Sequence, residues 1–200
     1  MKLKPVVLKM FSAIVAIILL PLSFAGAAIC PMGFHVGQTL EMGMNVYKGD
    51  VWTTLVTGDL MDFGTLNYDG FTGLTAENYF TVVFFPSTNG GRYQITQTAH
   101  ALTNTAGAEL PTGACVVTPW AVDPTNGQSF PGDHQVGAQG SFVADDKLIY
   151  KSDAAGTYNA VAATYAITSN PDNGSTARIS RDQKVGEYEG CILFELSLAN

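Results

Sequence analysis

The sequence predicts an all-β protein built as an antiparallel sandwich, and three observations carry this prediction. Apolar and polar residues alternate with a period of two along most of the chain, which places the apolar side chains on one face of each strand. Glycine accounts for 21 of the 200 residues, and turn signals recur at short intervals. Only 14% of the residues are charged, which argues against long solvated helices, coiled coils and disordered tails.

The alternating runs define the expected strands. They cover residues 36–46, 51–57, 60–66, 79–85, 92–99, 114–122, 141–151, 157–168 and 187–198. The run 79–85 is apolar throughout, which is typical of a strand buried on both faces, and it ends at Pro86. Asn89-Gly90-Gly91 predicts a hairpin turn into the strand 92–99. Because no repeat or composition break divides these strands, they predict a single sandwich of the immunoglobulin type.

Residues 1–27 have the organisation of a signal peptide. Three lysines form its positive region: Lys2, Lys4 and Lys9. An apolar run over 11–20 follows, and Ala25-Gly26-Ala27 offers the small residues that signal peptidase accepts, so we expect cleavage after Ala27. The protein would then pass through the periplasm to the cell surface or the extracellular space. An uncleaved anchor over 10–29 is the alternative, whereas cleavage leaves no membrane span.

The charge balance excludes several partners. The net charge is −7, and removal of the three lysines in 1–27 leaves seven basic and 17 acidic residues, a net charge of −10. Nucleic acids and anionic membranes need a clustered lysine and arginine face, so neither is expected as a partner.

The three cysteines, Cys30, Cys115 and Cys191, are too far apart for a redox motif or a zinc cluster. In an oxidising compartment we expect one disulfide and one odd thiol. All three pairings are possible. We favour Cys115–Cys191, because Cys30 lies three residues into the mature N-terminus, and we expect the Cys191 thiol to point away from the main core.

No catalytic constellation stands out, so we expect neither an enzyme nor a cofactor. Nucleophile-elbow, HExxH and Walker motifs are absent. Asp145 and Asp146 are adjacent, which on a regular strand sends their side chains to opposite faces and prevents shared acid–base chemistry.

No metal site is expected either. The histidines, which are His35, His100 and His134, lack the spacing of zinc ligands. Two oxygen-rich loops could bind calcium weakly, although turn chemistry explains their residues equally well. These loops contain Asp123 and Asn126, or Asp172 and Asn173.

Several segments resemble the spore coat U family, whose members include archaic-type chaperone–usher pilins. Leu60-Met61-Asp62-Phe63-Gly64-Thr65-Leu66 is similar to the "LDFGTL" strand of that family, and Arg92-Tyr93-Gln94-Ile95-Thr96 is similar to its "YTI" strand. Leu148-Ile149-Tyr150 lies where that family has a "LTYNLY"-like strand, and the segment 179–190 resembles the approach to its terminal strand, in the same order.

The resemblance implies an incomplete sandwich that polymerises when the N-terminal strand of one subunit completes the next. Partners would be further copies of the chain, with a periplasmic chaperone and an outer-membrane usher during assembly. The chain would divide into the signal peptide 1–27, an extension 28–50 with the donor strand 36–46, and a sandwich domain 51–200. The candidate pocket-filling residues are Val36, Leu40, Met42, Met44 and Val46, and Gly43 would permit close backbone approach.

Two alternatives stay open. The strand 36–46 can fold back into its own domain as an ordinary edge strand. The protein would then be a monomeric secreted binding module for a glycan or another surface ligand. Four aromatic side chains could serve as stacking platforms, namely Trp52, Tyr68, Trp120 and Tyr158, although we favour packing in the core for them.

Overall fold

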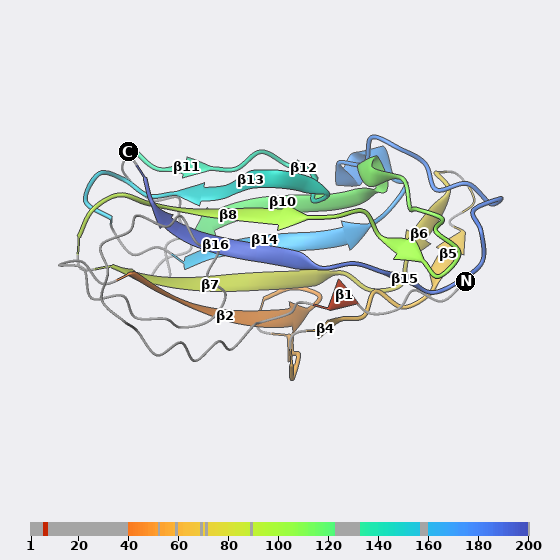
Figure 1. Ribbon diagram of the computed structural model, residues 1–200, viewed down its shortest axis with the longest axis horizontal. Helices are drawn as coiled ribbons and strands as arrows, with labels where there is room; N and C mark the ends of the chain where they lie inside the picture. The colour runs from red at the N-terminus through yellow and green to blue at the C-terminus, as the bar shows by residue number, and fades with distance from the viewer. Residues whose placement is uncertain are drawn as a thin grey trace.

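The computed structural model describes residues 6–7, 40–51, 53–58, 60–68, 70, 72–88, 90–122, 133–156 and 160–199. In this part of the chain the strands pair antiparallel, and helix is limited to two short 3₁₀ turns, η1 (Thr112–Ala114) and η2 (Pro171–Asn173). The all-β, antiparallel prediction is therefore confirmed (Figure 1).

The larger of the two main sheets has six strands. In order across the sheet they are β12 (Gly140–Ser141), β10 (Cys115–Val122), β14 (Ala160–Ile167), β7 (Phe80–Thr88), β2 (Leu40–Lys48) and β3 (Thr54–Leu55). The second main sheet has four strands, in the order β11 (Gln135–Val136), β13 (Ala144–Lys151), β8 (Tyr93–Ala99) and β16 (Ile192–Leu198).

Three two-stranded pairs complete the described structure. They are β1 (Val6–Val7) with β4 (Leu60–Met61), β5 (Leu66–Tyr68) with β6 (Leu74–Ala76), and β9 (Thr103–Asn104) with β15 (Tyr188–Glu189). Apart from the two residues of β1, the predicted signal peptide lies outside the described residues. The short strands β9 and β11 lie between the predicted strands, and β12 overlaps the start of the predicted strand 141–151 at Ser141.

The two main sheets pack against each other through a shared core. Phe84 of β7 and Phe194 of β16 meet edge to face with ring centroids 5.0 Å apart, and Tyr165 of β14 also contacts Phe194. Aromatic pairs of this geometry add to the free energy gained by burying their apolar area. The outer face of the six-stranded sheet carries a smaller cluster around Tyr47, Val83 and Ala162.

The apolar run over 79–85 forms a strand that is buried on both faces, as predicted. Phe80 and Phe84 point into the main core, whereas Val83 packs in the outer cluster. The strand does not end at Pro86 but continues to Thr88. The pairing with β14 ends at Phe84, so among the described residues β2 is the one strand that pairs at Pro86, and a proline is tolerated in such a one-sided ladder.

The predicted hairpin at Asn89-Gly90-Gly91 is wrong. β7 and β8 belong to different main sheets, so this connection crosses from one sheet to the other. The connection between β13 and β14 crosses at the same end (Figure 1). There a Cβ on Gly156 would lie 2.1 Å from the carbonyl oxygen of Gly91, and the φ of Gly156 is +68°. Only glycine fits where these two connections touch.

The predicted strands at 51–57 and 60–66 are also shorter than expected. The first is reduced to β3, and the second divides into β4 and the start of β5. Between them Asp62 accepts the backbone N–H of Gly64, whose φ is +73°, so the chain turns there. Met61 and Phe63 are nevertheless fully buried, which explains the apolar alternation in this segment.

Candidate functional site

The candidate assembly strand is β2, which contains most of the residues predicted to donate. All nine of its residues pair with β7 of the same chain, from Leu40 opposite Thr88 to Lys48 opposite Phe80. On its other side only Tyr47 and Lys48 pair with β3, and Val56 donates a hydrogen bond to the carbonyl of Val46. Among the described residues, the 40–45 portion of β2 has no strand along this outer side.

The alternation predicted for this strand is confirmed where it is described. Leu40, Met42 and Met44 are half-buried against the main core, Val46 is buried, and Glu41 and Gly43 are exposed. Val36 lies outside the described residues. The strand continues to Lys48 because Tyr47 packs in the outer cluster. β2 therefore presents an apolar inner face that is only partly covered by its own chain.

A tight connection holds the end of β2 in place. Gly49 adopts φ +77°, its N–H donates to the carbonyl of Tyr79 at 2.8 Å, and its carbonyl accepts from Thr81 Oγ1 at 2.8 Å. Thr53 Oγ1 donates to the carbonyls of Lys48 and Asp50. Burial, followed by the hydrogen bond and charge of Asp50, raises the pKa of Tyr79. Gly49, Asp50 and Thr53 therefore hold a defined connection at the end of β2.

Gly43 has no special role within this chain. A Cβ at this position would lie 3.6 Å from Phe85 Cβ, which is an ordinary contact distance, and its φ is not positive. The expected close backbone approach is therefore absent from the pairing of β2 with β7.

The favoured disulfide between Cys115 and Cys191 is not formed in the structure. Both thiols are free: Cys115 is fully buried in β10, whereas Cys191 is exposed just before β16. The two residues belong to opposite sheets, and their side chains differ in direction, one into the core and one to the surface. Cys191 points away from the main core, as expected. Burial raises the pKa of the Cys115 thiol to about 12. Cys30 lies outside the described residues.

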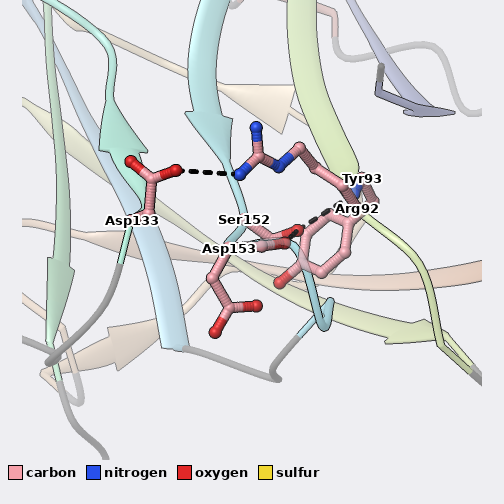
Figure 2. Close-up of polar contacts among 5 residues, drawn as sticks. All are labelled: Arg92, Tyr93, Asp133, Ser152 and Asp153. Atoms are coloured by element: carbon pink, nitrogen blue, oxygen red, sulfur yellow. Dashed lines mark hydrogen bonds and ion pairs between the residues drawn. The ribbon is translucent and has the colours of Figure 1, made fainter.

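Polar side chains gather at the end of the molecule where β8 begins and β13 ends (Figure 2). Ser152 is fully buried, and its hydroxyl accepts the N–H of Tyr93 at 2.9 Å and donates to the carbonyl of Asp153 at 3.0 Å. These contacts tie the two strands together through backbone groups. Arg92 pairs with Asp133 at 3.0 Å, and because Asp133 is 92% exposed the pair contributes little to stability.

The other candidate acid–base and metal-binding residues do not come together at one site. Asp145 and Asp146 lie at a bulge in β13, where Asp146 adopts φ 49°, and both are exposed, so they do not alternate across a regular strand as predicted. Asn170 Oδ1 accepts the N–H of Asp172, which is turn chemistry. Within the described ranges, no group of three or more His, Cys, Asp or Glu residues could hold a metal ion. Asp123, Asn126 and His35 lie outside those ranges.

The aromatic side chains predicted to pack or to bind sugars differ in exposure. Trp120 is half-buried in the outer cluster and donates its indole N–H to Thr164 Oγ1. Tyr68 is 44% exposed and carries the guanidinium of Arg181 over its ring. Trp52 and Tyr158 lie outside the described residues. The prediction that these side chains pack against other apolar residues is therefore confirmed for Trp120, and it is wrong for Tyr68.

Comparisons of the chain with family models, curated proteins and solved structures find no significant match. Among the described residues, no helix is long and apolar enough to cross a membrane.

Proposed function

We propose that the protein is a secreted structural subunit of a cell-surface or extracellular filament, in which neighbouring copies exchange strand β2. The two main sheets would form an immunoglobulin-like sandwich, and removal of the signal peptide after Ala27 would release the subunit for assembly. The observation that carries the proposal is the way β2 is held: it pairs along its full length with β7, whereas on its other side, among the described residues, only Tyr47 and Lys48 pair with a strand, β3.

The side chains of β2 suit a strand that changes partners. Leu40, Met42 and Met44 point inward at alternate positions, so each can fill a separate pocket in the same register on another copy. Because they are only half-buried, each contributes about 1 kcal/mol, which is roughly half the value for full burial. The same contacts form again in the neighbour, so exchange costs little free energy.

Removal of β2 would expose its partner strand. Val82 and Phe84 of β7 lie next to β2 and are fully buried, so a subunit that has given up the strand presents apolar surface and an unpaired edge. Such an edge promotes aggregation. A periplasmic chaperone and an outer-membrane usher would cover it until the next subunit arrives.

Cross-linking between copies tests the exchange. Glu41 and Ser87 are both exposed and face each other across β2 and β7, so a cysteine at each position can form a disulfide without disturbing the core. Chains carrying Glu41→Cys are mixed with chains carrying Ser87→Cys under assembly conditions, in a Cys30→Ser, Cys191→Ser background. We expect mixed disulfide dimers on non-reducing gels and filaments by electron microscopy.

The matched control replaces Ser87→Cys with Asp145→Cys, an exposed position on β13 of the other sheet. This pair should give no mixed dimer. In a single chain, Glu41→Cys with Ser87→Cys should lock β2 in place and prevent assembly until a reductant is added. Failure of mixed cross-linking, together with a monomer at high concentration, would contradict the proposal.

A monomeric secreted binding module is the second candidate, because β2 pairs with β7 of its own chain in the structure. It predicts that the locked chain behaves like the unmodified one in every assembly assay.

A further inference from the structure

An open pocket of about 400 Å³ lies between the β5–β6 pair and the segment 178–181. Figure 1 shows the β5–β6 pair at the end of the molecule opposite the start of β8. Its lining residues are Tyr68, Gly73, Arg178, Ile179, Ser180 and Arg181. A space of this size accommodates one or two sugar rings.

The floor of the pocket is fixed by buried backbone contacts. Ile179 is 1% exposed, its N–H donates to Ser169 Oγ at 2.7 Å, and its carbonyl accepts from the N–H of Leu74. Gly73 adopts φ +130°, and a Cβ there would lie 2.9 Å from Ser169 Oγ, so the two walls approach closely only because this residue is glycine. The pocket is therefore held open by the fold.

Positive charge gathers at this pocket in an otherwise acidic protein. The chain has three arginines and a net charge of −7, and two of those arginines line the pocket. The guanidinium carbon of Arg181 lies 3.5 Å from the ring centroid of Tyr68, and this cation–π contact holds the charge at the pocket. Arg178 Nε donates to the carbonyl of Thr72. Within the described residues, no carboxylate forms an ion pair with Arg181.

We propose that this pocket binds the carboxylate of an acidic saccharide. A guanidinium held against an aromatic ring still has N–H groups that a carboxylate can accept in a bidentate pair. Ser180 Oγ accepts the N–H of Asp182 and keeps its own proton for a sugar hydroxyl. The exposed part of Tyr68 offers apolar contact to the ring. This binding does not depend on strand exchange.

Calorimetric titration of the mature protein tests the proposal. The probes are trigalacturonate, neutral maltotriose and inorganic sulfate at the same ionic strength. We expect trigalacturonate to bind and maltotriose to bind at least tenfold more weakly. Arg181→Gln should weaken trigalacturonate binding at least tenfold, whereas Arg92→Gln, which removes the same charge at the far end, should change it less than twofold.

Thermal melting of both variants checks that each one folds. The proposal would be overturned by no binding of trigalacturonate to the folded protein, by equal binding of maltotriose, or by equal losses for Arg181→Gln and Arg92→Gln. Sulfate that binds as tightly as trigalacturonate would also overturn it, because the site would then recognise charge without the sugar.

Discussion

Strands β2 and β16 occupy similar positions but are held in different ways. β2 is the first strand of the six-stranded sheet along the chain and β16 is the last of the four-stranded sheet, and they contact each other across the two sheets. Each pairs along its full length with one strand, β2 with β7 and β16 with β8. The inward side chains differ: Ile192 and Phe194 of β16 are each 2% exposed, whereas those of Leu40, Met42 and Met44 are half-buried.

If a terminal strand leaves, this difference in side-chain burial predicts that β2 leaves more easily than β16, although both are paired along their full length. Phe194 is enclosed by Phe84 at 5.0 Å and Tyr165 at 6.1 Å, both edge to face. Withdrawal of β16 would open the centre of the core. Withdrawal of β2 removes the half-buried Leu40, Met42 and Met44 from the margin of the core, together with the buried Val46 and Tyr47 at the end of the strand. Methionine adapts readily to a second site.

The largest expected effect is a difference in stability between two truncations. Phe194→Ala should lower the free energy of unfolding by about 3–5 kcal/mol, because it leaves a cavity between the two sheets. Met42→Ala should lower it by only about 1 kcal/mol, since its side chain is half-buried. Urea denaturation of the locked monomer, with Glu41 and Ser87 replaced by linked cysteines, measures both values. Equal losses would break the comparison between β2 and β16.

The sequence predicts the faces of these strands well. Period-two alternation identifies the inward residues of β2, and it places Ile192, Phe194 and Leu196 on one face of β16, as observed. This succeeds because alternation depends only on the local geometry of a strand and on burial of one face.

The partners of the strands could not be predicted in the same way. Asn89-Gly90-Gly91 turns the chain whether the next strand joins the same sheet or the opposite one, so the crossing between β7 and β8 has no local signature. The pocket at Arg178 and Arg181 was missed for a related reason. It needs Tyr68, which lies more than one hundred residues away in sequence. Arginines clustered in an acidic chain are the signal that could have identified it.

The reactivity of the thiols tests whether a disulfide links Cys191, just before β16, to Cys30 in the N-terminal segment. Exposed Cys191 should react with iodoacetamide at pH 8 in the native protein, whereas Cys115 should react only after unfolding. A native Cys30–Cys191 disulfide in non-reducing peptide maps would contradict this result. It would also restrain the segment that precedes β2.

The Cys115 thiol also sets the direction of a pH effect. Burial raises its pKa from 9.0 to about 12 in the folded state, so above pH 9 the unfolded chain loses this proton first. Stability should therefore fall by about 1 kcal/mol per pH unit between pH 9 and pH 12. Cys115→Ala, measured over the same range, should remove this part of the slope. An unchanged slope would show that the thiol does not contribute.

The smallest expected effect concerns Gly43 and separates the two states of β2. Within one chain a Cβ at this position meets Phe85 at an ordinary 3.6 Å, so Gly43→Ala should change the stability of the locked monomer by less than about 0.5 kcal/mol. The matched control is Gly156→Ala, where the new Cβ would collide with the carbonyl of Gly91 and the loss should be severalfold larger. If β2 occupies the same register on β7 of a neighbour, Gly43→Ala should leave filament formation intact as well. A loss of assembly with an unchanged monomer would mean that the exchanged strand lies closer to its new partner than β2 lies to its own.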